Sequence, residues 1–534
     1  MGGAFLMEAK KITPEAAKAE VNRAKNPNFT EHENVLKELL SKVVEVDFRK
    51  LAYKSKYTNT AKKFERLQRE HAALLADKNK NKSKIEQNKS EREQEKKKLD
   101  KMKLRPRHFI VYTVEHLISL AKRHNWGLTK YQQSIYLFNG AYWAEIPEDV
   151  FTVFLGEAAE RMGVTEVDAK YCDFRAKLFD QFNKTAVLAK PKTDPSKVLI
   201  NLKNGTLEVQ PNGETKLRPF DRRDFLTYQM PFEFDPEATA PKFEKFLFEV
   251  LPEDDKRRVL AEYLGSVFLR NGNDYLKIEK ALFLYGTGRN GKSVVYEVVN
   301  ALLGNENTSS FTLEDLTNDN GYYRAQIANK LVNYASEING KLQADKLKTL
   351  TSGEPIGARL PYKDPVTIKD YAKLVFNVNE LPRNVEQTHA FFSRFLIIPF
   401  EITIPDSKAD RNLHKKIIDA ELPGVLNWIL EGLNRLLKNK DFTPCESSAR
   451  VLEQFKIESD SVKFFLQEHN AKPHVNEWLK LSQLYAEYRD FTTTEGAQPV
   501  KRMNFKKRLQ EAGYAVEKKN VGNVIFVNGN FETH

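Results

Sequence analysis

The stretch LFLYGTGRNGKSVVYEVVNALLG, residues 282–304, decides the fold class of this chain. The apolar run 281–285 predicts a short buried strand, and the run 294–303 predicts a helix that ends at Gly304. Between them stands G-x-x-x-x-G-K-S, whose glycines let the backbone turn so that N–H groups and the helix N-terminus point at an anion. Strand, glycine-rich turn and helix in this order are typical of a phosphate-binding loop.

The residues of this loop predict a nucleotide and a metal ion. Lys292 would place a positive charge on the β- and γ-phosphates of ATP, and Ser293 would ligate Mg²⁺. The predicted cofactors are therefore ATP and Mg²⁺. The predicted nucleotide-binding residues are Gly286, Thr287, Gly288, Arg289, Asn290, Gly291, Lys292 and Ser293.

Three polar residues downstream complete a candidate catalytic set. The apolar run 331–335 predicts an adjacent strand that ends in Ser336-Glu337, so that Glu337 would orient the attacking water and help to hold the metal. A third predicted strand ends at Asn379, whose amide would contact the γ-phosphate, and Arg394 stands immediately before a fourth. The ordinary alternatives are a polar residue at a strand end for Glu337 and an ion-paired arginine for Arg394.

This order of motifs resembles the superfamily-three helicases, and more specifically the C-terminal helicase part of phage, plasmid and poxvirus primase–helicases. The blocks INLKNGTLEV, LKTLTSGEPIGARLPYKDPVTIKDYAKLVFNVNELP and ELPGVLNWILEGLNRLL also read like that family. The similarity covers residues 105 to 534, and its core is 281–400.

The resemblance implies an AAA+-like ATPase in a homo-oligomeric ring, usually a hexamer, with ATP between subunits. Arg394 would then act on the neighbouring subunit's ATP, and Asn379 would act as sensor. Many phosphate-loop ATPases carry two acidic residues where this chain has Ser336-Glu337. Whether Glu337 serves as a metal ligand, as the base or as both therefore stays open.

The block GEPIGARLPYKDP matches the family's DNA-contacting hairpin, with Lys363 near its tip and Arg359 on its flank. A basic tip in the central channel would grip the phosphates of single-stranded DNA, while a duplex or fork lies outside. The alternative for this block is a plain surface turn at Asp364-Pro365.

The last eighty or so residues predict a winged helix, made of three helix-like segments and two strands about Gly522-Asn523. Phe505 and Leu509 would face its core. A solvated basic face is the alternative to DNA binding. The predicted DNA-binding residues on the third helix are Lys501, Arg502, Lys506, Lys507 and Arg508.

Composition limits the classes of partner. The chain has 85 Lys and Arg against 73 Asp and Glu, a formal net charge of +12, which favours an anionic partner such as nucleic acid or an acidic membrane surface. Two distant cysteines, Cys172 and Cys445, provide neither a zinc module nor a disulfide framework. No apolar run approaches the ~18 residues of a membrane span. We expect a cytoplasmic protein with no membrane partner.

The positive charge is concentrated between Arg49 and Arg107, where 21 basic residues face 8 acidic ones. Residues 78–103 have too few apolar side chains to fold alone, which predicts a solvated helix or a disordered arm. A linker and a nucleic-acid-binding arm stay open. Asp47 has no obvious carboxylate partner for a primase metal site, so we expect a primase or other replication protein to act in trans.

The predicted fold class is multidomain α/β and α+β, with a parallel-sheet ATPase core. Asn139-Gly140 and Asn204-Gly205 predict hairpin turns in the α+β part. The sequence favours an ATP-dependent, ring-forming DNA helicase of a phage, plasmid or other mobile element, with a replication initiator or a duplex translocase as alternatives. The predicted parts are a charged arm (1–104), an α+β domain (105–232), a helical collar (233–272), the ATPase (273–440) and the winged helix (441–534).

Overall fold

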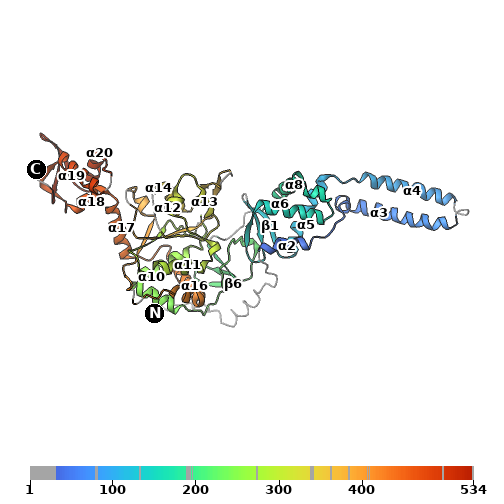
Figure 1. Ribbon diagram of the computed structural model, residues 1–534, viewed down its shortest axis with the longest axis horizontal. Helices are drawn as coiled ribbons and strands as arrows, with labels where there is room; N and C mark the ends of the chain where they lie inside the picture. The colour runs from blue at the N-terminus through green and yellow to red at the C-terminus, as the bar shows by residue number, and fades with distance from the viewer. Residues whose placement is uncertain are drawn as a thin grey trace, which may run out of the picture. The chain divides into compact units, whose positions relative to one another are not determined.

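The computed structural model of the chain describes residues 32–77, 82–131, 134–187, 194, 196–271, 275–336, 342–360, 364–382, 385–405, 407, 409–495 and 498–531 (Figure 1). They fall into two compact units. Unit 1 comprises Met1–Thr193 and Arg218–Thr227, and unit 2 comprises Asp194–Leu217 and Tyr228–His534. In the described ranges, no helix combines the length and the apolar character that crossing a membrane requires.

Unit 1 is mostly helical, with one small antiparallel sheet in the order β1-β2-β3. Its elements are α2 (His32–Ser41), α3 (Phe48–Leu74), η1 (Leu75–Asp77), α4 (Lys82–Lys101), α5 (Pro106–Arg123), β1 (Gly127–Tyr131), β2 (Ser134–Phe138), β3 (Trp143–Ile146), α6 (Glu148–Arg161), α7 (Glu166–Lys170), α8 (Cys172–Thr185) and η2 (Arg222–Asp224).

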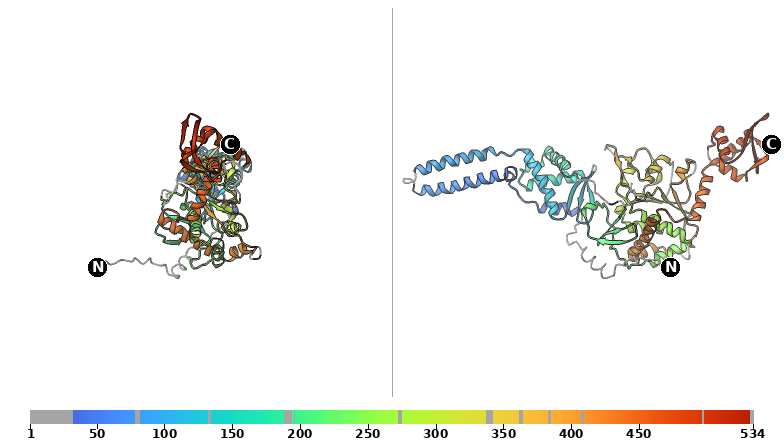
Figure 2. Two further views of the ribbon diagram at one scale, coloured as in Figure 1. Left: turned by 90° about the vertical axis from the view of Figure 1, so that its left-hand side faces the viewer. Right: turned by 180° about the vertical axis from the view of Figure 1, so that it is seen from behind.

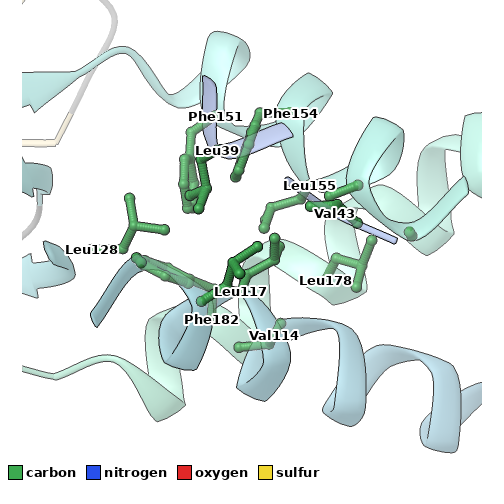
Figure 3. Close-up of a cluster of buried hydrophobic side chains, with 14 of the residues drawn as sticks. Leu39, Val43, Val114, Leu117, Leu128, Phe151, Phe154, Leu155, Leu178 and Phe182 are labelled. Carbon is green, nitrogen blue, oxygen red and sulfur yellow. The ribbon is translucent and has the colours of Figure 1, made fainter. Parts of the chain in front are cut away.

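The core of unit 1 is a cluster of aliphatic and aromatic side chains that point toward one another (Figure 3). It contains Leu39 of α2, Leu117 of α5, Phe151 of α6 and Phe182 of α8, and Figure 3 shows Leu39 beside Phe151 and Leu117 beside Phe182. The core therefore takes side chains from both sides of the boundary predicted at residue 104. Burying this apolar surface is the main term that stabilises the unit.

The hairpin predicted at Asn139-Gly140 is confirmed, because β2 and β3 pair antiparallel around it. The side chain of Asn139 accepts hydrogen bonds from the N–H groups of Ala141 and Tyr142, each at 3.0 Å, which fixes the turn.

Helices α3 and α4 run antiparallel and lie side by side (Figures 1 and 2). Residues 82–101 of the charged segment are helical, and they follow the longer helix α3. Helix α4 has few apolar residues of its own, and it packs against α3, which buries one side of it.

Unit 2 holds the remaining elements. They are β4 (Val198–Leu202), β5 (Gly205–Val209), β6 (Thr215–Arg218), α9 (Pro241–Val250), α10 (Asp254–Ser266), β7 (Ala281–Tyr285), α11 (Lys292–Leu303), η3 (Asn305–Asn307), β8 (Thr308–Ser309), α12 (Leu313–Thr317), α13 (Tyr322–Gln326), β9 (Val332–Ala335), α14 (Ala344–Ser352), β10 (Ile356–Ala358), β11 (Val366–Ile368), β12 (Lys373–Val378), α15 (His389–Phe392), β13 (Phe395–Pro399), α16 (Leu413–Asn439), α17 (Glu446–Glu458), α18 (Ser461–Glu468), β14 (Lys472–Lys480), α19 (Leu481–Thr494), α20 (Arg502–Glu511), β15 (Val516–Lys519) and β16 (Gly522–Asn528).

The sheet β4-β5-β6 groups with unit 2, whereas the sequence placed it in one domain with residues 105–187. The hairpin predicted at Asn204-Gly205 is present, but Leu202 pairs with Gly205, so its turn lies one residue earlier at Lys203-Asn204. The N–H of Met230 donates to the carbonyl of Asn201 at 2.9 Å. Contacts of this kind between distant residues leave no local sequence pattern. The predicted domain boundaries stay predictions.

The centre of unit 2 is a five-stranded parallel sheet in the order β13-β7-β12-β9-β8. Helices α10, α11 and α16 cover one face, and α12, α13 and α14 lie on the other (Figure 1). The core strands are almost entirely buried, as expected for a parallel sheet covered on both sides. The expectation that the strand ending in Glu337 lies next to β7 is wrong, because β12 pairs between β7 and β9.

The C-terminal part of unit 2 contains α18, α19 and α20 and the antiparallel sheet β14-β16-β15. The predicted burial of Phe505 and Leu509 is confirmed. The turn predicted at Gly522-Asn523 is displaced, because Lys519 pairs with Gly522 and leaves Asn520-Val521 as the turn. The sequence did not predict β14.

Candidate phosphate-binding site

The loop between β7 and α11 has the backbone that its glycines predict. Three of its residues have positive φ, namely Gly288 at 85°, Arg289 at 54° and Gly291 at 89°. A Cβ on Gly286 would lie 2.4 Å from the Phe400 carbonyl oxygen, so only glycine fits there. The loop is thus packed against the end of β13 and leads directly into the N-terminus of α11.

Lys292 is the first residue of α11, and only 7% of it is exposed. Its Nζ donates to the Gly286 carbonyl oxygen at 2.6 Å and to Asn290 Oδ1 at 3.0 Å. Asn290 in turn donates to the Phe400 carbonyl oxygen at 3.1 Å, which fixes its amide. Burial lowers the pKa of the Lys292 ammonium below its usual value.

The donor set of this loop fits a polyphosphate. In the described residues, both acceptors of Lys292 are uncharged oxygens, so no carboxylate neutralises its charge there. The N-terminus of α11 adds N–H groups and a positive dipole end. Thr287, Gly288, Arg289 and Ser293 are exposed, so the loop is accessible to a ligand.

Asn379 and Ser336 follow the carboxyl ends of β12 and β9, which is the same end of the sheet as this loop. Val378 pairs with Tyr285, and the N–H of Gly286 donates to the Val378 carbonyl oxygen at 3.0 Å. Asn379 therefore follows the strand directly beside the loop, and its side chain is exposed. Glu337 lies outside the described residues. In the described ranges no group of three or more His, Cys, Asp or Glu side chains could hold a metal ion. The role of Ser293 as a Mg²⁺ ligand stays a prediction.

Arg394 lies at the opposite end of the strands, where β7 and β13 begin. It precedes β13, whose first residue pairs with Ala281, and the N–H of Ala281 donates to the Arg394 carbonyl oxygen at 2.8 Å. The Arg394 guanidinium forms an ion pair with Glu279, and its Nε has no hydrogen-bond partner in the described part of the chain. Hydrogen bonds from Lys277 and then from Arg394 lower the pKa of the Glu279 carboxyl.

A buried polar pair behind the loop was missed by sequence reasoning. The Tyr334 hydroxyl on β9 donates to Asn377 Oδ1 on β12 at 3.0 Å, and the Tyr334 ring packs edge-on against Tyr296 of α11 at 4.9 Å. Burial raises the pKa of Tyr334. These contacts join β9, β12 and α11 beneath the loop. The sequence signal is Tyr334 and Asn377 within strands made mostly of apolar residues.

The predicted DNA-contacting residues are described only in part. Strands β10 and β11 pair antiparallel, as the predicted hairpin requires, and Arg359 is exposed just after β10. Lys363 lies outside the described residues.

The basic residues of α20 are not equivalent. Arg508 forms an ion pair of 2.9 Å with Asp460, whose side chain is 4% exposed, so this arginine holds α20 against α18. Lys507 lies 3.7 Å from Glu511. Lys501 and Arg502 are exposed at the start of the helix, and Lys506 is half-buried.

Comparison with known families finds two partial matches. Residues 284–394 match the model of a family of unknown function (DUF5906), and residues 117–252 match a model described as D5 N terminal like. The first match contains the loop, Asn379 and Arg394.

Two curated relatives of this chain are viral proteins. The chain is 24% identical over 232 residues to "Putative helicase L207/L206" of Acanthamoeba polyphaga mimivirus, covering 42% of this chain and 24% of the relative. It is 25% identical over 229 residues to "Putative helicase 121R" of Invertebrate iridescent virus 3, covering 39% and 23%. The chain thus spans about a quarter of the length of these relatives.

Among solved structures, two of the NrS-1 C-terminal region align with 78% of this chain. One covers 98% of that region at 12% identity and the other 99% at 14% identity, both with a TM-score of 0.44.

Proposed function

We propose that this chain, a protein of the phage and viral primase–helicase type, is an ATP-driven DNA helicase that works as a ring. The observation that carries the proposal is Lys292, a buried ammonium at the start of α11 whose described acceptors are uncharged oxygens of its own loop. A polyphosphate would replace these oxygens as the partner of the charge.

The chain's own groups account for binding of the triphosphate. The loop N–H groups and Lys292 would hold the β- and γ-phosphates, and Ser293 would hold Mg²⁺, which neutralises charge on the phosphates when bound. Asn379, beside the loop, would contact the γ-phosphate. Glu337 would orient the water that attacks it and remove its proton.

Arg394 would complete the site of a neighbouring subunit. Strand β7 has five residues at about 3.3 Å each, and Arg394 lies at the end of the sheet away from the loop. It therefore cannot reach the phosphates of its own chain without a rearrangement of the sheet. In a closed ring of copies, with a hexamer as the expected form, Arg394 of one subunit would lie near the phosphate loop of the next subunit.

DNA would be held in two places. The β10–β11 hairpin, with Arg359 and Lys363, would contact single-stranded DNA in the central channel. The winged-helix arrangement of the C-terminal part would contact a duplex or fork through Lys501, Arg502, Lys506 and Lys507, and Arg508 would serve mainly to hold Asp460.

The test is strand separation with the full chain. We expect ATP-dependent unwinding of a forked DNA by the wild type and none by Lys292→Ala, with Lys415→Ala, an exposed lysine of α16, as the matched control. Hydrolysis without strand separation would favour the replication initiator. Movement along a blunt duplex without unwinding would favour the duplex translocase.

A further inference from the structure

The helical hairpin of α3 and α4 has a polar seam. Leu67 of α3 is buried, but Asn88 and Glu95 of α4 are also buried, at 5% and 4% exposure. Asn88 Nδ2 donates to the Leu67 carbonyl oxygen at 3.2 Å. Buried polar groups of this kind fix the register of two helices at a cost in stability.

Few basic residues of the hairpin are needed to hold it together. Glu95 is paired with Lys63 at 3.0 Å and with Lys98 at 2.9 Å, which satisfies the buried carboxylate. Helices α3 and α4 together carry 16 Lys and Arg against 7 Asp and Glu, a net charge of +9. The hairpin therefore keeps a large excess of positive charge that its own fold does not use.

The excess is concentrated on α3, which has 8 basic and 2 acidic residues. Lys62, Arg66 and Arg69 recur at i, i+4 and i+7, so they share one side of the helix, and all three are exposed. Asn59 extends this series by one turn. We call Asn59, Lys62, Arg66 and Arg69 the α3 basic stripe. Its two acidic neighbours pair with arginines of the stripe at 3.4 and 4.0 Å, with both partners highly exposed.

Helix α4 has a different pattern. Its exposed lysines Lys82, Lys89 and Lys96 are each followed four residues later by an acidic residue, in turn Glu86, Glu93 and Asp100. Positive and negative charges therefore alternate along this side of α4. The two helices offer one basic face and one mixed face.

We infer that the α3 basic stripe binds the phosphate backbone of a nucleic acid, independently of the nucleotide site. Binding to a polyanion releases its condensed counterions, and this favours a dense row of cationic side chains. The exposed residues between Asn59 and Glu70 are all polar or charged, whereas the buried centre of a protein–protein interface is typically apolar. The regular helix that follows the kink at Lys54 runs from residue 55 to Leu74, about 30 Å at 1.5 Å per residue, which is somewhat less than one turn of duplex DNA.

The experiment measures binding of the full chain without nucleotide to a labelled 30-bp DNA duplex, the corresponding single strand and an RNA of the same sequence, over a series of KCl concentrations. We expect Lys62→Gln/Arg66→Gln/Arg69→Gln to weaken binding at least tenfold at low salt. The slope of log Kobs against log salt should decrease in magnitude by about 2 to 3, since each phosphate contact contributes about 0.9. The three substrates distinguish duplex from single strand and DNA from RNA.

The matched control is Lys82→Gln/Lys89→Gln/Lys96→Gln, which removes the same charge from the mixed face of α4. It should change the slope by less than half as much, with circular dichroism showing equal helix content in both variants. Equal losses in the two variants, or an unchanged slope in the α3 variant, would overturn the inference. Binding to phosphatidylserine vesicles instead of nucleic acid, abolished by the α3 substitutions, would also overturn it. Because binding is measured without nucleotide, a protein that lacks ATPase activity can still support the inference, which separates this result from failure of the proposed ATPase.

Discussion

Lys292 and Arg394 lie at opposite ends of the strands of one parallel sheet, with the length of β7 between them. Lys292 stands at the carboxyl ends of the strands, and Arg394 precedes the strand that pairs with β7 from its first residue. Two groups that would act on the same triphosphate are therefore separated within one chain. This separation favours a site that two copies of the chain complete together.

Replacing Arg394 should affect turnover more than nucleotide binding. An arginine that stabilises the transferred phosphoryl group is worth about 10³ to 10⁵ in kcat, so Arg394→Ala should lose at least about 10³ with ATP affinity changed only a few-fold. Steady-state ATPase rates and binding of a fluorescent ATP analogue check this. Glu279→Gln, which weakens only the ion pair, should retain turnover within about tenfold. A comparable loss of kcat in Glu279→Gln would mean that the pair is structural and that Arg394 is not the catalytic arginine.

Gly291 is expected to tolerate no side chain. A Cβ there would lie 2.9 Å from the Phe246 ring and 3.0 Å from Val250, and the backbone φ is 89°. Gly291→Ala should therefore lower stability by about 1–3 kcal/mol through overpacking, in addition to backbone strain, and should weaken ATP binding. Thermal unfolding with and without ATP measures both effects.

Gly288→Ala is the control for Gly291→Ala. Gly288 has a similar φ of 85°, but a Cβ there would meet nothing within 4 Å. It should show only the strain of a left-handed alanine, about 1–2 kcal/mol. If both variants lost the same stability, packing against α9 would not be what requires glycine at residue 291.

Glu262 is a fully buried carboxylate that joins α10 to α16. It accepts hydrogen bonds from Arg435 Nε at 2.9 Å, from the Thr443 N–H at 2.8 Å and from the Thr443 hydroxyl at 2.6 Å. Arg435→Met leaves this charge without its cationic partner and should cost about 3–5 kcal/mol, seen as a lower midpoint of urea unfolding. The double variant Glu262→Leu/Arg435→Met should lose less than Arg435→Met alone. A larger loss in the double variant would contradict this account.

Lys373 should make stability depend on pH above neutrality. Burial lowers its pKa to about 8 from an ordinary value of 10.5, and its Nζ donates to Asn271 Oδ1 at 2.7 Å. Between these two values the unfolded chain binds the proton more tightly than the folded chain, so this group stabilises folding increasingly as pH rises from 8 to 10.5. The Tm of the wild type should therefore rise relative to that of Lys373→Met over this range. A constant difference in Tm would show that the Lys373 pKa is the same in both states.

Local patterns predicted the local parts of the site. The strand over 281–285, the glycine turn and the helix over 294–303 follow from short-range rules. The structure has β7 at Ala281–Tyr285, and α11 begins two residues earlier than predicted, at Lys292. Strand order was not predictable in this way. Strand β12 pairs with both β7 and β9 through hydrogen bonds between residues far apart in the chain. The composition of a strand does not indicate which strand lies next to it.

Other differences have the same physical origin. Strand β14 was missed because Lys472–Lys480 is mostly exposed and lacks an alternating apolar pattern. Arg508 looked like a free cation in the sequence, and only the fold brings it to Asp460. Asn88 and Glu95 are buried where α3 pairs with α4. Polar residues of this kind do not predict a helix interface from the sequence.

The central claim, that each ATP site is built from two copies of the chain, is tested most directly by mixing two inactive variants. Lys292→Ala lacks the phosphate-binding ammonium but supplies Arg394, and Arg394→Ala does the reverse. With random assembly at a 1:1 ratio, about a quarter of the interfaces in a ring would hold both residues. We predict that the mixture regains about a quarter of the wild-type ATPase rate. Activity no higher than that of the separate variants, at every ratio and with mixed rings verified, would contradict the claim.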